Sequence, residues 1–406
     1  MPSGFGWVDF VEEDRQRMLD VIQLFKEQET VDELGIGTIR DAFADYLFPG
    51  TSTVQTRVRY MLFIPWIYLS LERKKIPSAQ IAKNARSEEV KLIYTLLDSG
   101  ETEGVIGRIA KEDLVRLPSN IYWNGLWSWG IRLFPGTQDE YHRYLDHYYK
   151  GIGRVYSEGD EDTDIDSVPS NWHLGLPPSS DNFHEHAEFA LTKDEASYIQ
   201  ERILQRHPNS LLAILVREPE HVSANFIWEH PILNSLLHSL RDEISHAQNF
   251  SDTIYGAALL YNLMLAQLLN QGEWIADYQS RLSKWAGDLS SRWSQLISWY
   301  NDLKTFWLCS ALKRARISYL TKKFVEDWFR IIFKEDSSPK ISENQSARKL
   351  IYNREIQLKH NRARLENTRA RKLWRGSSGA SKLDFRWRNA SGILQDIIKG
   401  LTIDGK

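Results

Sequence analysis

The chain has 406 residues, of which 42% are apolar and 26% charged, and its formal net charge is −3. This composition is typical of an ordinary globular protein, long enough for two or three domains with full-sized cores. The single cysteine, Cys309, excludes an internal disulfide and a four-cysteine zinc site. No apolar run reaches the roughly 18 residues of a membrane span, and the first residues lack the basic and apolar regions of a signal peptide. We therefore expect a cytoplasmic protein without a membrane partner.

The predicted elements are mainly α-helical, because Leu, Arg, Glu, Gln and Ala are common and alternating β-branched runs are scarce. An amphipathic stripe predicts a first helix over residues 8–27. After two glycines, Thr38 marks the start of a second helix that ends near Phe48.

The next helix forms a helix-turn-helix-like pair with the one before it. Ser52 and Gln55 read as a capping box, which predicts a helix over residues 54–63 with a kink at Pro65. In a DNA-binding pair, the first turns of the second helix contact phosphates or bases. The secondary candidates for nucleic-acid contact are therefore Thr53, Gln55, Arg57 and Arg59. A plain packed helix pair explains the same pattern and is the more common arrangement.

Two further helices are predicted over residues 87–98 and 103–117, the second closed by Pro118. An aromatic cluster that includes Trp123, Trp127 and Trp129 follows, and we interpret it as core rather than as a base-stacking surface. Thr137 and Glu140 form another capping box. His142 and His147 are five residues apart, a poor match to a helical metal pair.

Residues 157–182 carry an acidic run and several prolines, and are predicted to be a linker. His184 and His186 flank a glutamate just after it, but no third metal ligand is identifiable. Thr192 and Glu195 begin a helix, and apolar positions then recur at helical spacing from residue 210 to 333. This pattern predicts a helical bundle with seams filled by tryptophans: Trp274, Trp285, Trp293, Trp299, Trp307 and Trp328.

The stretch from Lys340 to Arg388 is strongly basic, with fourteen Lys and Arg against four Asp and Glu, although the whole chain is acidic. Residues 342–374 are predicted to be one long helix, in which Ile351, Leu358 and Leu365 form a narrow apolar seam for docking. Gly376 to Gly379 end it, and a final amphipathic helix closes the chain. The chain thus divides into an N-terminal helical domain (1–156), a linker (157–182), a bundle (183–340) and a basic C-terminal arm (341–406).

A positive arm on an acidic body indicates a polyanionic partner, DNA or RNA. Arginines and lysines neutralise phosphates, and a neighbouring tryptophan can stack on bases. The predicted nucleic-acid-binding residues are Arg354, Lys359, Arg362, Arg364, Arg369, Arg371, Lys372, Arg375, Lys382, Arg386, Trp387 and Arg388.

We find no sequence motif for catalysis. The chain lacks a Walker A motif, a Rossmann glycine triplet and a nucleophile elbow, and Cys309 lies in an apolar helix. No cofactor, metal or catalytic residue is predicted, which favours a non-enzymatic protein without excluding a site assembled from distant residues.

Four short phrases carry a resemblance to a known family: Val31-Asp-Glu-Leu-Gly35, Ile39-Arg-Asp-Ala-Phe-Ala44, Phe48-Pro-Gly-Thr-Ser-Thr53 and Leu383-Asp-Phe-Arg-Trp387. Together they resemble a bacterial family of about 400 residues catalogued as a domain of unknown function. Its members look to be encoded beside helicase-like and phospholipase-D-like proteins. The resemblance implies a role in antiviral defence or DNA processing, together with other protein subunits, and it supplies no catalytic residue.

Three hypotheses follow from these patterns. The first is a non-enzymatic nucleic-acid-binding subunit of a defence or DNA-processing complex. The second is a protein-interaction scaffold whose arm docks on acidic surfaces. The third is a cryptic metal-dependent nuclease.

Overall fold

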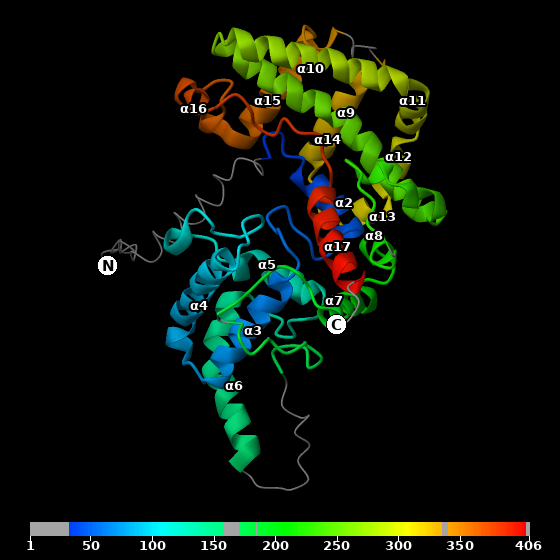
Figure 1. Ribbon diagram of the computed structural model, residues 1–406. Helices are drawn as coiled ribbons and strands as arrows, with labels where there is room; N and C mark the ends of the chain where they lie inside the picture. The colour runs from blue at the N-terminus through cyan, green and yellow to red at the C-terminus, as the bar shows by residue number, and fades with distance from the viewer. Residues whose placement is uncertain (1–31, 158–169, 184, 219, 335–339, 403–406) are drawn as a thin grey trace, which may run out of the picture. The chain divides into compact units, whose positions relative to one another are not determined.

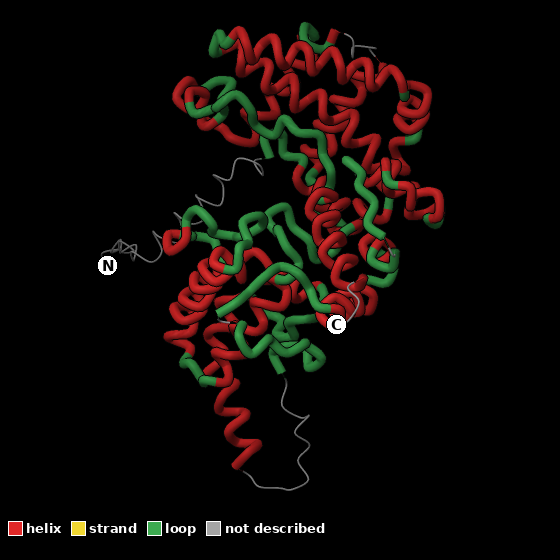
Figure 2. The backbone as a smooth tube through the Cα atoms, viewed as in Figure 1, coloured by secondary structure: helices red, strands yellow, loops and turns green. Residues whose placement is uncertain are grey.

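The structure, a computed structural model, describes residues 32–157, 170–183, 185–218, 220–334 and 340–402 (Figure 1). All regular elements in these ranges are helices (Figure 2), with one isolated β-bridge between Arg132 and Trp172. The predicted mainly α class is therefore confirmed. The predicted helix over 8–27, the acidic run at 158–166 and His184 lie outside the described residues.

The described chain forms two compact units, each built from segments far apart in the sequence. The first unit combines the residues up to Phe43 with Arg241–Phe385, and the second combines Ala44–Leu240 with the residues from Arg386 onward. The predicted domains are instead consecutive segments of the chain. The basic stretch is thus shared, with Lys340–Phe385 in the first unit and Arg386–Arg388 in the second.

The first unit is a helical bundle around the long helix α9. Its helices are α9 (His238–Leu268, from residue 241), α10 (Gly272–Ser291), α11 (Trp293–Asn301), α12 (Leu303–Leu308), α13 (Ser310–Lys313), α14 (Tyr319–Lys334), α15 (Gln345–Lys359), the 3-10 turn η6 (His360–Arg362), α16 (Thr368–Lys372) and the start of α2 (Gly37–Leu47).

Tryptophans join these helices, as predicted, but only part of the set is in the core. Trp285, Trp299 and Trp328 are buried, whereas the other three of the predicted set are half-buried. The indole N–H groups of Trp285 and Trp328 donate to the α9 carbonyls of Asp252 and Thr253, at 2.7 and 3.0 Å. A side chain at Gly256 would meet the Trp285 ring at 2.2 Å, so glycine is required for this contact.

The second unit is a layered set of helices around α3. Its helices are the end of α2, α3 (Tyr60–Arg73), α4 (Ser78–Asp98), η1 (Lys111–Asp113), α5 (Pro118–Ser128), α6 (Gln138–Ser157), α7 (Lys193–Arg206), α8 (Leu211–Leu215), η3 (Ile227–Glu229), η4 (Pro231–Ser235) and α17 (Trp387–Thr402). The helix α3 packs against α4 and α5, α4 packs against α6, and the C-terminal α17 packs on α7. Because α3 is apolar on nearly all sides, it is buried along most of its length.

Local capping signals are confirmed at two helices. The hydroxyl and backbone N–H of Thr137 donate to Glu140 at 2.9 and 2.7 Å at the start of α6. Thr192 and Glu195 form a reciprocal capping box at α7. The aromatic cluster is also core, as interpreted, with Trp123 and Trp129 buried, although Trp127 is 39% exposed.

The helix-turn-helix prediction is wrong in its second helix. The backbone N–H of Ser52 does donate to Gln55 at 3.1 Å, but α3 begins only at Tyr60 and continues through Pro65. The Tyr122 hydroxyl accepts from the N–H groups of Thr56 and Arg57, and Asp396 accepts from Val58. The N–H groups of residues 56–58 therefore donate to side chains from other helices, and residues 51–59 form a loop instead of the start of a helix. The buried Tyr60 and Trp66 match the plain packed alternative.

Two other predicted helices also differ. The helix at 87–98 begins earlier, at Ser78, while residues 103–117 contain only the short turn η1. Pro118 opens α5 rather than closing a helix, because a proline is tolerated at the first helical position.

The predicted long helix over 342–374 is wrong as well. α15 ends at Lys359, and His360 follows with φ +50° and ψ −126°. The Glu355 carboxylate accepts from the N–H groups of Arg364 and Leu365, both at 2.9 Å, and so holds the chain in a turn. Of the predicted seam, Ile351 and Leu365 are buried, but Leu358 is 38% exposed.

Candidate functional site

The cations of the basic stretch fall into two classes. One class is turned inward and binds carboxylates or carbonyls of the same unit. The other is exposed on the surface, mostly in the first unit. The sequence could not separate the two classes, because both consist of Lys and Arg residues from the same stretch of the chain.

Arg354 of α15 belongs to the inward class and is 4% exposed. Its guanidinium donates to the carbonyls of Leu34 and Gly35 at 2.8 and 3.1 Å and to the Thr321 hydroxyl at 2.9 Å. Its guanidinium carbon also lies 5.2 Å from the centre of the Phe324 ring. Arg354 therefore fixes the segment before α2 and does not face a ligand.

Lys359 and Arg364 converge on the buried carboxylate of Glu33. One Glu33 oxygen accepts from Arg364 at 2.7 Å and from the Ser378 hydroxyl, and the other accepts from Lys359. The Lys359 ammonium also lies 3.1 Å from Glu355, whose carboxylate receives the Tyr261 hydroxyl at 2.6 Å. Burial lowers the pKa of Lys359 to about 7, and the charge of Arg364 acts in the same direction. We call Glu33, Glu355, Lys359, Arg364 and Ser378 the Glu33 cluster.

Two more of the predicted nucleic-acid-binding residues, Lys382 and Arg386, bind groups of their own units instead. Lys382 pairs with Asp252, which also binds Arg292. In the second unit, Arg386 donates to Asp45 at 2.5 Å and to the carbonyl of Thr51 at 2.8 Å.

Trp387 is not available for base stacking. It is 1% exposed, its indole N–H donates to the carbonyl of Ala224 at 2.9 Å, and its ring lies 5.8 Å from that of Phe48. It anchors the first turn of α17 instead.

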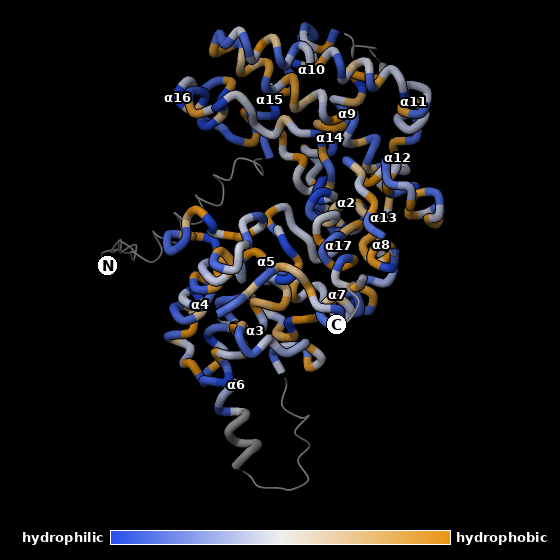
Figure 3. Tube along the Cα trace, viewed as in Figure 1, coloured by the Kyte–Doolittle hydropathy of each residue, from blue (hydrophilic) through white to orange (hydrophobic). Residues whose placement is uncertain are grey.

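The surface class lies around η6 and α16. Its members in the first unit are exposed: Arg362, Arg369, Lys372 and Arg375. Half-buried Arg371 lies among them and donates to the carbonyl of Leu365 at 3.2 Å. Figure 3 shows largely hydrophilic chain at α16. We call these four exposed side chains the α16 patch. Arg388, in the second unit, is also exposed.

The loop of residues 51–59 gives its polar side chains to its own unit. Gln55 is 1% exposed and donates to the carbonyl of Gly50 at 3.2 Å. Arg57 makes a two-pronged pair with Asp396, with both N···O distances at 2.9 Å, and Arg59 donates to Glu195 at 2.8 Å. Only Thr53 of the secondary candidates is exposed, and its carbonyl accepts from Asn389 at 3.1 Å. This loop therefore links α17 and α7 to the rest of the second unit, and its side chains are not directed at a ligand.

A buried polar chain in the second unit was not predicted. The Ser119 hydroxyl donates to Glu89 at 2.7 Å and accepts from the Gln138 amide at 2.8 Å. The same amide donates to the Tyr68 hydroxyl at 2.6 Å, which lies 3.0 Å from the His142 ring nitrogen Nε2. Burial raises the pKa of Glu89 to about 7 and lowers that of His142 to about 4. No sequence signal indicates this chain, since its members come from four helices.

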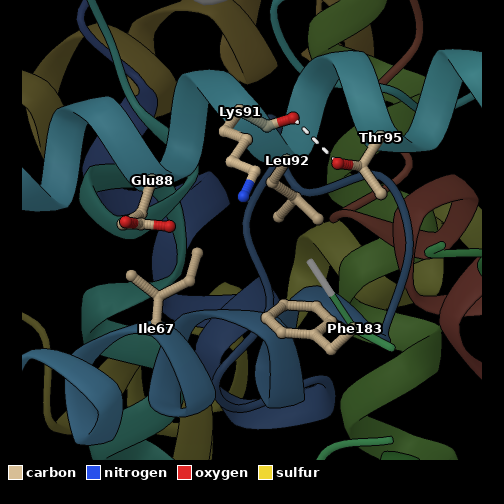
Figure 4. A pocket seen from close by; sticks show the side chains of 6 residues that line it. All are labelled: Ile67, Glu88, Lys91, Leu92, Thr95 and Phe183. Atoms are coloured by element: carbon tan, nitrogen blue, oxygen red, sulfur yellow. Dashed lines mark hydrogen bonds between the residues drawn. The ribbon is translucent and has the colours of Figure 1, made fainter. Parts of the chain in front are cut away.

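The hollow shown in Figure 4 is too small for a substrate pocket. It lies between α3, α4 and Phe183, and its cavity volume is about 10 Å³, which is space for little more than one water molecule. Ligand pockets usually measure about 300 to 1,000 Å³. The Thr95 hydroxyl that lines it donates to the carbonyl of Lys91 at 3.1 Å.

Other chemical groups give no site within the described ranges. No group of three metal-ligating side chains occurs in the part of the chain that the structure describes. Cys309 is buried, and burial raises the pKa of its thiol to about 12, so the thiolate nucleophile is disfavoured. Among the described helices, none is long and apolar enough to cross a membrane.

The comparison with family models decides what the chain is related to. The model of a family of unknown function, DUF6361, matches residues 2–400. The chain belongs to this family. The match to DUF6361 confirms the expected resemblance to an uncharacterised family of this length, and it assigns no role to any residue. No curated protein and no solved structure matches the chain.

Proposed function

We propose that this member of DUF6361 is a non-enzymatic nucleic-acid-binding protein that contacts phosphates through the α16 patch. The observation that carries the proposal is the exposure of Arg362, Arg369, Lys372 and Arg375 on one short segment. Glu366 is the only acid between them in the sequence. A cluster of exposed cations neutralises a phosphate backbone without reading its sequence.

The α16 patch is presented on an ordered support. Asn367 caps α16 by accepting from the N–H groups of Arg369 and Ala370 at 2.9 and 3.1 Å. After α16, the Asn262 side-chain amide binds the backbone of Ser378 twice. It donates to the Ser378 carbonyl and accepts from the Ser378 N–H, both at 2.8 Å. Cations on an ordered surface lose less conformational entropy on binding than those on a loose tail.

The proposal is narrower than the sequence-based prediction. Arg354, Lys359, Arg364 and Lys382 bind groups of the first unit, and Arg386 binds groups of the second. Their replacement would disturb folding as well as binding. They are therefore unsuitable for a binding test.

A protein-interaction scaffold is the second candidate. Leu373 lies among the cations and is 77% exposed. An apolar side chain surrounded by positive charge fits an acidic protein surface with an apolar centre. The wider role in bacterial antiviral defence or DNA processing, with other protein subunits, rests on the family resemblance. Purification of the tagged chain from its host, followed by mass spectrometry, would identify such subunits.

The test is a salt series with duplex DNA, single-stranded DNA and RNA, read by fluorescence anisotropy. The variant is R362Q/R369Q/K372Q/R375Q. For duplex DNA the slope of log K against log salt is about −0.9 per phosphate contact. Losing four contacts should therefore make the slope shallower by roughly 3 to 4.

The matched control removes four exposed cations of the second unit, as R73Q/K74Q/K83Q/K91Q. It carries the same change in net charge, so a general electrostatic effect would weaken both variants equally. Equal affinities and slopes for the α16 variant and the wild type would reject the proposal. If the α16 variant binds nucleic acid normally but an L373E variant loses co-purified proteins, the scaffold is supported instead.

A further inference from the structure

The Glu33 carboxylate is held in the way that proteins hold a bound oxyanion. One of its oxygens receives the Arg364 guanidinium at 2.7 Å and the Ser378 hydroxyl, and the other receives the Lys359 ammonium. The Glu33 side chain is 4% exposed, so these donors replace its water shell. A guanidinium, an ammonium and a hydroxyl are the donors that proteins use for phosphate and carboxylate groups.

Glu355 has a different part in the Glu33 cluster. One of its oxygens accepts from the backbone N–H of Leu365, and the other accepts from that of Arg364, both at 2.9 Å. The single proton of the Tyr261 hydroxyl also goes to Glu355, at 2.6 Å. Glu355 therefore fixes the turn that brings Lys359 and Arg364 together, whereas Glu33 fills the space between their charges.

The donors are arranged by a strained backbone residue. His360 has φ +50° and ψ −126°, a region that residues with a β-carbon rarely adopt. Such strain persists only where the surrounding structure fixes it. It reverses the chain directly after Lys359 and allows Arg364 to return to the same carboxylate.

The segment that delivers Glu33 is held independently of its carboxylate. Asp32 caps α2 by accepting from the N–H groups of Ile36 and Gly37 at 2.7 and 2.5 Å. Arg354 holds the carbonyls of Leu34 and Gly35. Loss of the Glu33 side chain would therefore leave the segment attached and the donors in place.

The charges of the Glu33 cluster are balanced only while Glu33 is present. Below a pH of about 7, where Lys359 is protonated, Lys359 and Arg364 carry two positive charges that face the carboxylates of Glu33 and Glu355. Without Glu33, a buried positive charge remains uncompensated, and such a charge is costly. The side chains of Lys359 and Arg364 are still 19% and 23% exposed, which leaves a route for an ion from solvent.

We propose that Lys359, Arg364 and Ser378 form an oxyanion-binding site which Glu33 occupies as an internal ligand, and in which a phosphoryl group replaces Glu33 when that carboxylate withdraws. The ligand is a phosphoryl group of either a free phosphate or a phosphodiester. The proposal goes beyond nucleic-acid binding by the α16 patch and does not depend on it, because the three donors are distinct from the four exposed cations.

The test compares the full-length wild type with an E33A variant by isothermal titration calorimetry, using inorganic phosphate at constant ionic strength. The variant should bind one phosphate per chain at least tenfold more tightly than the wild type, because the internal competitor is gone. Its thermal midpoint should be lowered, and phosphate but not chloride should restore it. A second titration with dimethyl phosphate separates the sources: binding of both ligands indicates a site open to phosphodiesters, and binding of phosphate alone indicates free phosphate.

Two further variants keep the proposal falsifiable. E33A/R364Q should lose the gained phosphate binding, because the guanidinium donor is missing. E33Q keeps the size of the side chain and should bind phosphate less well than E33A, which would show that the space must be vacated. The proposal is overturned if E33A binds phosphate no better than the wild type, or if E33A/R364Q binds it as well as E33A.

If E33A is unstable, its refolding yield with and without phosphate is measured, and no gain with phosphate also overturns the proposal. A normal salt slope for nucleic acid in E33A, together with its loss in the α16 variant, would keep the two proposals separate.

Discussion

At the scale of single residues, burial rather than residue type decides the chemical state of the ionisable groups. Glu89 is fully buried and accepts from the hydroxyl and backbone N–H of Ser119, both at 2.7 Å. Desolvation outweighs these bonds and raises its pKa to about 7. At the other end of the same polar chain, desolvation lowers the pKa of His142 to about 4. Both groups are therefore uncharged over an interval in which the unfolded chain would ionise them.

The first prediction concerns the pH dependence of stability. Between pH 4.5 and about 7, folded Glu89 keeps a proton that the unfolded state has lost, so its contribution to stability falls as pH rises. Between about 4 and 6.5, unfolded His142 binds a proton that the folded state does not, so its contribution rises with pH. E89Q should remove the falling contribution and H142Q the rising one. Urea unfolding at several pH values from 4.5 to 7.5 measures both.

The control for this experiment is the wild type, in which the two contributions oppose each other. Relative to it, stability should increase more steeply with pH in E89Q and less steeply in H142Q. Parallel profiles for all three proteins would contradict the assignment of the two protonation states.

At the scale of elements, the turn between α15 and α16 is the one the sequence described least well. Helical spacing continues past Lys359, but the carboxylate of Glu355 binds the N–H groups of Arg364 and Leu365 and ends the helix. His360 then takes a conformation that favours glycine. The turn decides which cations lie on the surface, since Lys359 and Arg364 point inward while Arg362 lies between them and is exposed.

The second prediction follows from this strain. H360G should stabilise the protein by about 1 kcal/mol, because glycine adopts a positive φ without a β-carbon clash. The neighbouring N361G is the matched control, since Asn361 is also exposed but has no positive φ. It should be neutral or destabilising by up to about 1 kcal/mol. Urea unfolding measures both, and destabilisation by H360G would show that the backbone is not strained there.

At the scale of the whole molecule, each unit is completed by residues from the other end of the chain. In the second unit, Asp396 of α17 pairs with Arg57 and accepts from the N–H of Val58 at 3.2 Å. The Asp396 side chain is 8% exposed, and α17 packs on α7. The C-terminal helix is thus part of the fold of this unit rather than an appended tail.

The third prediction tests this closure. D396N should destabilise the protein by about 2 to 4 kcal/mol, because the amide keeps only one acceptor oxygen and removes the negative charge that compensates the Arg57 guanidinium in a partly buried site. The pair of Arg281 and Asp277 gives the control, because the Asp277 side chain is 59% exposed, and D277N should change stability by less than about 1 kcal/mol. Chemical unfolding followed by circular dichroism measures both. Equal small effects would show that α17 is held by apolar packing alone.

The sequence by itself determined the helical class and several helix starts. Those at Thr137 and Thr192 depend on side chains three residues apart, so the local chain contains all the information they need. The same signal misled at Ser52, where the predicted bond to Gln55 forms but Tyr122 and Asp396 take the following backbone donors. The sequence also grouped twelve candidate nucleic-acid contacts in one basic stretch, and it did not separate the inward-facing cations from the exposed ones.

Only the tertiary structure made that division. Lys359 and Arg364 are half-buried and turned inward because Glu33, more than three hundred positions earlier in the chain, supplies their counter-charge. Arg362 and Arg369, on the same stretch, are exposed. A charged side chain is buried only where a partner meets it, and the meeting of distant segments is a property of the fold and not of the local sequence.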